Sequence, residues 1–238
     1  MHARFPSHAR TLGPPPSPLW PFDWSIGLAA FAVIGVAIRA IWFTPIDARQ
    51  GPAQKIYYVH PPSAIVGMYV AFGLMALASG VYLWLHDERA DLLAESSGEV
   101  GLAFLTVALV TGPIWGRTVW GAWWTWDARL TSTLFLWFLA AGYLVLRGAI
   151  EDPALRARYS AVLALLFVPL IAFIHLSVYF FRTLHPMPIV IKPSEPSLPR
   201  AMLMTFGLAV LAMLILYIAL VRARYRLALV RARVEDAP

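Results

Sequence analysis

The side chains best suited to forming a binding site lie in one short segment between two apolar stretches. This segment, WGRTVWGAWWTWDARLT, runs from Trp115 to Thr131 and contains five of the ten tryptophans in the chain. Indole rings at this density can form a flat apolar platform. The alternative is the belt of aromatic side chains found at the ends of most membrane spans. Grouping in one loop with glycine spacers favours the platform, which would fit a flat amphipathic anion such as haem.

Charged side chains flank these tryptophans. Asp127 with Arg117 and Arg129 could form an ordinary salt-bridged loop, the usual role of charges at a membrane surface. Alternatively, the two guanidinium groups could receive carboxylates such as haem propionates, because a planar fork of donors suits a carboxylate. Asp127 would then orient one arginine or an indole N–H. The residue pattern alone leaves both interpretations open.

Two histidines lie before and after this segment, each followed by proline. His60 precedes Pro61-Pro62, and His185 precedes Pro186. Proline favours the first turn of a helix and disfavours helix in the residue before it. We therefore expect His60 at the start of one span and His185 beyond the end of another. A lone histidine at a helix end is more often a hydrogen-bonded interface residue than a ligand. Two of them could bind one iron from opposite faces of a porphyrin.

The composition is that of a polytopic membrane protein. The 238 residues are 60% hydrophobic and only 13% charged, whereas about a quarter of the residues in soluble domains are charged. A helix needs about 20 apolar residues to cross a bilayer. We predict an all-α fold with six transmembrane helices in residues 24–221, preceded by a segment 1–23 and followed by a basic tail 222–238. The predicted spans are 24–43, 63–85, 98–115, 130–146, 161–181 and 201–221.

The placement of arginines predicts the orientation of these spans. The net charge is +6, and arginines gather in residues 1–23, in the loop between the fourth and fifth spans, and in residues 222–238. Short cytoplasmic loops are enriched in Lys and Arg, so we expect both termini in the cytoplasm. The first, third and fifth loops, which contain His60, the tryptophan segment and His185, then share the outer face. We interpret the tail as a topology signal in contact with anionic lipid, and expect no nucleic-acid binding.

Several kinds of chemistry are excluded or assigned elsewhere. The chain has no cysteine, which excludes disulfides, thiol redox centres and thiolate metal sites. It has no GxxxxGK[ST] phosphate-binding loop, so energy from nucleotide hydrolysis by that route must come from a partner. No apolar stretch with a small-residue cleavage site precedes Trp24, so the first span is expected to be an uncleaved anchor.

Local signals predict where some elements end. Gly112 and Pro113 indicate that the third span ends near residue 113, which would place the tryptophans on a bent interfacial segment. The inner loops, 86–99 and 151–153, look connective. We expect Arg39 to extend to the outer interface. His175, inside the fifth span, is expected to be a packing or hydrogen-bonding residue, and His2, His8 and His86 fall on the inner side.

The tryptophan segment resembles the WWD signature of a superfamily of haem-handling proteins, and the whole chain resembles the CcmC family of bacterial cytochrome c maturation. The resemblance extends over IYYVHPPSAIVGMYV, SVYFFRTLHP and KPSEPSLPRAML. Pro61-Pro62 and the proline-rich N-terminus cannot be assigned to the family pattern. The resemblance implies that His60 and His185 are axial ligands of haem b on a periplasmic surface. That surface would consist of Trp115, Gly116, Trp120, Gly121, Trp123, Trp124, Trp126 and Asp127.

The resemblance also implies a function and a set of partners. It implies a bacterial inner-membrane protein that is not an enzyme and that delivers haem to the periplasmic chaperone CcmE. The implied partners are the ATPase CcmA, the membrane subunit CcmB and the single-span CcmD. One alternative is a haem channel, which would need polar residues along an interior path. A b-type cytochrome would need histidine pairs deep in the bilayer, and a transporter of another small molecule would bind no haem.

Overall fold

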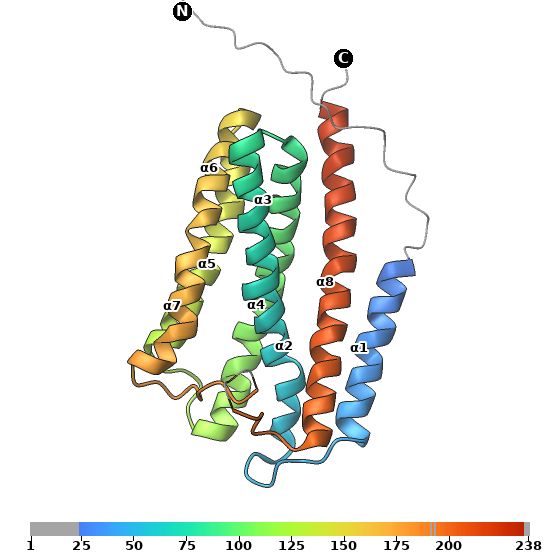
Figure 1. Ribbon diagram of the computed structural model, residues 1–238, viewed down its shortest axis with the longest axis vertical. Coiled ribbons are helices and arrows are strands. Elements are labelled where there is room, and N and C mark those ends of the chain that lie inside the picture. Colours follow the sequence, from blue (N-terminus) through green and yellow to red (C-terminus); the bar gives the residue numbers. More distant parts are fainter. Residues whose placement is uncertain (1–23, 191, 193, 236–238) are drawn as a thin grey trace, which may run out of the picture.

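The structure is a computed structural model that describes residues 24–190, 192 and 194–235, so the predicted segment 1–23 lies outside the described residues. Within these residues the regular elements are all helical. Six helical segments are long and apolar enough to cross a membrane: 24–42, 51–85, 88–120, 128–149, 153–180 and 200–234. Figure 1 shows them side by side in one bundle. The prediction of an all-α protein with six spans is therefore confirmed.

The second span is a composite of four helical pieces. It consists of a 3₁₀ helix η1 (Gly51–Tyr58), α2 (His60–Ala64), a π-helix η2 (Ile65–Ala71) and α3 (Phe72–Leu85). Two consecutive prolines fit the first turn of α2, because amide N–H groups there have no partner within the helix. The span therefore starts well before the predicted residue 63. The added turn, η1, buries the rings of Tyr57 and Tyr58.

The third span does not end at Pro113, contrary to the sequence prediction. Helix α4 (Glu88–Trp120) continues through this proline and ends at Gly121, whose φ of 75° is the left-handed conformation typical of a helix C-terminus. Proline removes one hydrogen bond from a helix interior, but membrane helices tolerate it where neighbouring groups compensate. Trp115 and Trp120 therefore lie on α4, and only the later tryptophans lie in the following loop.

Short connections join the remaining helices. Helix α5 (Ala128–Ala149) is followed by a turn in which Asp152 Oδ1 accepts hydrogen bonds from the amides of Ala154 and Leu155, which starts α6 (Pro153–Leu165). This agrees with the predicted turn at 151–153. The fifth span bends at Leu166, where α6 gives way to α7 (Phe167–Phe180). Pro169 explains the bend, because its ring would clash with the carbonyl of Leu165 in a continuous helix.

The last helix continues far beyond the predicted end of its span. Helix α1 (Trp24–Trp42) packs on α8 (Arg200–Glu235), and α8 also contacts α4. With a rise of about 1.5 Å per residue, α8 is about 54 Å long, clearly longer than the hydrocarbon core of about 30 Å. No break in the helix marks the predicted boundary at 221/222, so the basic segment continues α8 as far as Glu235.

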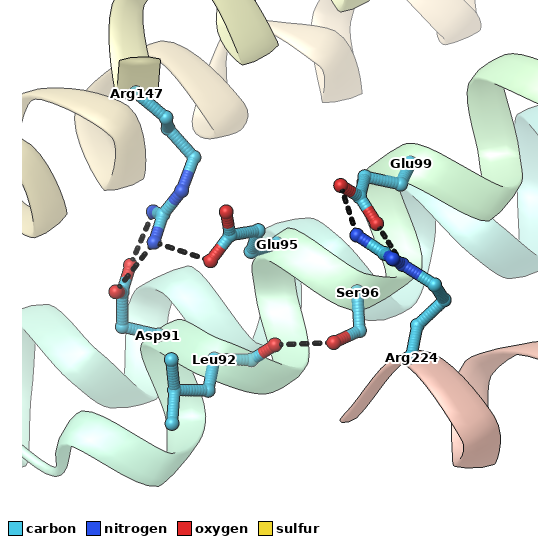
Figure 2. Close-up of polar contacts among 7 residues, drawn as sticks. All are labelled: Asp91, Leu92, Glu95, Ser96, Glu99, Arg147 and Arg224. Carbon is cyan, nitrogen blue, oxygen red and sulfur yellow. Dashed lines mark hydrogen bonds and ion pairs between the residues drawn. The ribbon is translucent and has the colours of Figure 1, made fainter. Parts of the chain in front are cut away.

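The stretch 86–99 is not a connective loop, contrary to the sequence prediction. Helix α4 starts at Glu88, and its first turns carry three carboxylates that pair with arginines of other helices (Figure 2). Arg147 of α5 donates to both oxygens of Asp91 at 2.7 and 2.8 Å and to Glu95 at 2.9 Å. Arg224 of α8 pairs with Glu99 through two nitrogens. These ion pairs fix α5 and α8 to α4 at the end of the bundle opposite the tryptophan segment.

The Arg147 ion pair yields a prediction about stability. Arg147 and Asp91 are buried, and removal of one partner leaves an uncompensated buried charge. We expect Arg147→Met to lower the free energy of unfolding by about 3–5 kcal/mol, measured by denaturant titration in detergent micelles. Arg147→Lys should lower the free energy of unfolding by less, because lysine keeps the positive charge but cannot form the bidentate contact. Arg158→Met, at an exposed site on α6, is the matched control, and equal losses in Arg147→Met and this control would contradict the prediction.

Candidate functional site

The loops 43–50 and 121–127 and the described residues of the fifth loop, 181–190, 192 and 194–199, lie at the same end of the bundle, the lower end in Figure 1. This is the arrangement that six consecutive spans require. The end is packed around Tyr57, Tyr58 and Phe206, with Trp115 and Val190 against them. Trp115 Nε1 also donates a hydrogen bond of 2.9 Å to Gln50 Oε1. The first loop, α4, α8 and the fifth loop are thereby joined into one structure.

His60 is the first residue of α2, as predicted, and its ring packs against α4. Its Nδ1 lies 2.9 Å from the carbonyl oxygen of Ala108 and 3.3 Å from Thr111 Oγ1. A carbonyl oxygen can only accept a hydrogen bond, so Nδ1 must carry the proton. Nε2 of the neutral ring therefore retains its lone pair.

A glycine makes this close contact with α4 possible. A Cβ atom added to Gly112 would lie 3.0 Å from Cε1 of His60, closer than most real contacts. The ring of Trp115, about one turn further along α4, lies 5.9 Å from the His60 ring in an edge-to-face arrangement. His60 is therefore held between a hydrogen bond, a glycine surface and an indole ring.

His185 has the same hydrogen-bonding pattern in a different setting. It lies in the loop after α7, outside helical structure as predicted, and its Nδ1 is 3.0 Å from the carbonyl oxygen of Pro186. The same argument places the proton on Nδ1 and leaves the Nε2 lone pair free. Its ring lies 6.3 Å from Trp120 in an edge-to-face arrangement. The two histidines thus contact two tryptophans of α4 that are five residues apart.

The environment keeps His185 uncharged. Burial lowers the pKa of its imidazole to about 4, and the nearby positive charge of Arg129 acts in the same direction. A positive charge on His60 would lower the pKa of His185 further. The ring is therefore neutral at physiological pH, the form in which histidine binds metals.

Asp127 connects the third loop with the fifth. Its Oδ1 accepts hydrogen bonds of 3.0 Å from the amides of Arg129 and Leu130, which caps α5. Its carboxylate also forms hydrogen bonds with Thr183 and Leu184, next to His185. Burial raises the pKa of this carboxyl, but the hydrogen bonds outweigh burial and hold the pKa below its usual value. Asp127 thus serves as a helix cap and as an anchor for the His185 loop.

The two arginines of the segment have different surroundings. Arg117 lies on the last turn of α4, where its Nη1 donates to the carbonyl of Gly121. Arg129 is half-buried at the start of α5 and acts electrostatically on Asp127, His185 and Tyr69. In the part of the chain that the structure describes, no oxygen accepts a hydrogen bond from the Arg129 guanidinium. The five donors of this group are therefore available to an anion.

The tryptophans do not form one flat surface. The rings of Trp115 and Trp120 contact His60 and His185, respectively. Trp123 and Trp126 are instead 60% and 77% exposed. The ring planes of Trp124 and Trp126 are 76° apart. These two rings border an open apolar hollow of about 510 Å³, also lined by Leu109, Pro113 and Leu134. The site therefore combines a two-histidine region with an adjoining aromatic hollow.

Two further glycines of the segment have local structural roles. Gly116 is buried, and a Cβ there would lie 3.0 Å from Cε3 of Trp120, the ring that contacts His185. Gly121 adopts the positive φ that ends α4 and turns the chain into the loop. Sequence reasoning did not identify Ala108, Thr111, Thr183 or Tyr69 as parts of the site. A backbone carbonyl leaves no signal in a sequence, and threonine or tyrosine in an apolar span is common.

The neutral state of His185 can be tested by titration. Because its pKa is about 4 in the folded protein and about 6.5 in an unfolded chain, the folded state binds fewer protons between these values. Stability contributed by this group is present above pH 6.5 and is lost as the pH falls toward 4. We expect NMR of histidine-labelled protein to show the His185 ring neutral at pH 5.5, with His185→Asn identifying the resonance. A titration midpoint at 6 or above would contradict this.

Comparison with known proteins identifies the family. The family model described as CcmC, heme exporter protein C, matches residues 18–237. The chain is 39% identical over 221 residues to the heme exporter protein C of Haemophilus influenzae, covering 93% of this chain and 86% of that protein. It is 38% identical over 212 residues to that of Bradyrhizobium diazoefficiens, covering 88% and 80%. It is also 38% identical to that of Escherichia coli K12 over 169 residues, covering 70% and 67%. With matches of this extent, the chain belongs to the CcmC family.

Proposed function

We propose that this protein binds haem b at the loop end of the bundle, with His60 and His185 as the axial ligands of the iron, and passes it on for cytochrome c biogenesis. The observation that carries the proposal is the hydrogen bond from Nδ1 of each imidazole to a backbone carbonyl. This arrangement is characteristic of metal-binding histidines, because it fixes the tautomer and orients the ring. It leaves one Nε2 lone pair on each histidine for the iron.

The set of available donors favours a porphyrin over a bare metal ion. Among the described residues, no group of three or more His, Asp or Glu side chains is placed to hold an ion. A metal bound by only two protein ligands needs further donors from elsewhere, and a porphyrin supplies four nitrogens of its own. The chemistry of the site therefore fits an iron that arrives already coordinated in a ring.

The surroundings fit the remaining parts of haem. The guanidinium of Arg129, from which no described oxygen accepts a hydrogen bond, suits a propionate carboxylate, and Arg117 at the rim offers a second positive charge. Trp124 and Trp126 border an apolar hollow that could cover the hydrophobic edge of the ring. Its volume lies within the usual range of roughly 300–1,000 Å³ for small-molecule sites. We assign Trp115, Gly116, Trp120, Gly121, Trp123 and Asp127 supporting positions around the ligand.

The location and partners are part of the same proposal. The site would face the periplasm, with both termini in the cytoplasm and the chain in the bacterial inner membrane. The acceptor would be the haem chaperone CcmE, and CcmA, CcmB and CcmD would complete the export system. Because the chain has no GxxxxGK[ST] motif, the ATPase would supply the energy. No step in this role requires the chain to act as an enzyme.

Separate replacement of the two histidines tests the proposal. Each of His60→Ala and His185→Ala should change the haem absorption spectrum from that of two axial imidazoles to that of one, and lower haem occupancy at least tenfold. Added imidazole should partly restore the spectrum. His86→Asn, at the opposite end of the bundle, is the control. An unchanged spectrum and stoichiometry in both alanine variants would show that these residues are not the ligands.

The close contact at Gly112 provides an independent test. Gly112→Ala adds a methyl group 3.0 Å from the His60 ring, so the ring must move or its hydrogen bond to Ala108 must lengthen. We expect haem affinity to fall about tenfold, which corresponds to about 1.4 kcal/mol. Gly142→Ala on α5, where a Cβ meets nothing within 4 Å, is the matched control and should bind haem normally. Equal affinities in the two variants would rule out this role for the contact.

A further inference from the structure

A third histidine in the loop half of the bundle, His175, also has its Nδ1 hydrogen-bonded to an oxygen, here the hydroxyl of Tyr69. We propose that His175, supported by Tyr69, is a loading site that holds haem by one imidazole before the haem reaches His60 and His185. The inference rests on the proposed function and extends it to the route by which haem arrives. Sequence analysis treated His175 only as a packing or hydrogen-bonding residue.

The hydrogen bond between these two side chains supports a ligand role. Nδ1 of His175 lies 3.0 Å from the hydroxyl oxygen of Tyr69, and the rings meet edge to face at 6.0 Å. A phenol hydroxyl can donate or accept, so this bond is compatible with either tautomer of His175. In the tautomer in which Nδ1 donates to the phenol oxygen, Nε2 keeps its lone pair and the ring is oriented. His175 then presents the same donor as His60 and His185, in each case with Nδ1 bonded to oxygen.

The position of the pair on the bundle is the second observation. Both residues lie in apolar spans, yet Tyr69 is 39% exposed and the neighbouring Tyr179 is 50% exposed. An ionisable side chain such as His175 within a membrane span is uncommon and is often functional. Tyr69 also lies in the π-helix η2, and π-helical turns occur frequently at functional sites. This pair is therefore accessible from the surface of the bundle.

Electrostatic contacts connect this pair with the main site. Arg129 acts on both Tyr69 and Tyr179, and the ring of Tyr179 lies 6.4 Å from that of His175. Arg129 also acts on His185. His175 thus contacts Tyr69 and Tyr179, and both tyrosines interact electrostatically with Arg129 at the rim of the main site.

The amphipathic nature of haem explains how Arg129, Tyr69 and His175 could contact the same haem molecule. Haem in one leaflet of a bilayer keeps its propionates at the water interface and its ring among the lipid tails. With the carboxylates near Arg129, the ring would lie beside Tyr69 and His175. A single imidazole holds haem less firmly than two, so the haem could move on to the two-histidine site.

The test separates the loading site from the main site. The starting variant is His60→Ala/His185→Ala in phospholipid nanodiscs, titrated with ferric haem from phosphatidylcholine vesicles and followed by absorption. We expect it to keep one haem per chain with the spectrum of a single axial imidazole. Adding His175→Asn to this variant should abolish that spectrum and weaken binding at least tenfold. Adding Tyr69→Phe should weaken binding less, because the ligand remains but loses its orienting hydrogen bond.

Two matched control variants test whether a loss of haem binding comes from general damage to the fold. His86→Asn and Tyr159→Phe, added to the same starting variant, replace the same residue types near the opposite end of the bundle and should change nothing. If the starting variant binds no haem, or if His175→Asn leaves its spectrum and affinity unchanged, the loading site is ruled out while the main site stands. If the starting variant keeps the spectrum of two axial imidazoles, the proposed function itself fails.

Discussion

The hydrogen bond from His60 Nδ1 to the carbonyl of Ala108 is the contact on which the arrangement of the site depends. It fixes the tautomer of the imidazole and holds α2 against α4 at the place where Gly112 lets the ring approach. The same carbonyl lies 3.4 Å from Thr111 Oγ1, whose shorter hydrogen bond, of 2.7 Å, goes to the carbonyl of Val107. Helix α4 thus packs against the ring of His60 and carries Trp115 and Trp120, whose rings contact the two histidines.

Ion pairs at the opposite end of α4 fix the position of this helix. Asp91, Glu95 and Glu99 lie four residues apart on successive turns, so they share one side of the helix and bond to arginines of α5 and α8. Charge-assisted contacts of this kind are costly to break when one partner is removed. They hold α4, α5 and α8 together at one end of the bundle. The other end contains the loops and the exposed aromatic rings.

The sequence predicted the architecture well because the signals for membrane helices are strong. Composition and the length of apolar runs predicted six spans, and the prolines after His60 and His185 placed these residues correctly at helix ends. The prediction failed where tertiary contacts override local preference. Pro113 did not end α4, because a membrane helix keeps its backbone hydrogen bonds in the absence of water. Residues 88–99 form the first turns of α4, where three carboxylates pair with arginines from distant parts of the chain.

The details of the site were less predictable than its location. The contact of Asp127 with Thr183 and Leu184 joins two loops that are more than fifty residues apart in the sequence, and no local pattern reports such a pairing. The division of the tryptophans between α4 and the loop follows from the continuation of α4. The partner of His175 could not be foreseen either, because Tyr69 is one of nine tyrosines and lies 106 residues away in the sequence.

The two proposed ligands differ in how firmly they are held, and this difference bears on how a ligand could leave. His60 belongs to a helix and packs against another helix, whereas His185 lies in a loop held through Asp127 and a hydrogen bond from its own amide to Thr183. Moving a loop disturbs fewer buried contacts than moving a helix, because loops open at lower free energy than core helices. In the proposed function, a ligand supplied by an acceptor would therefore displace His185 more readily than His60.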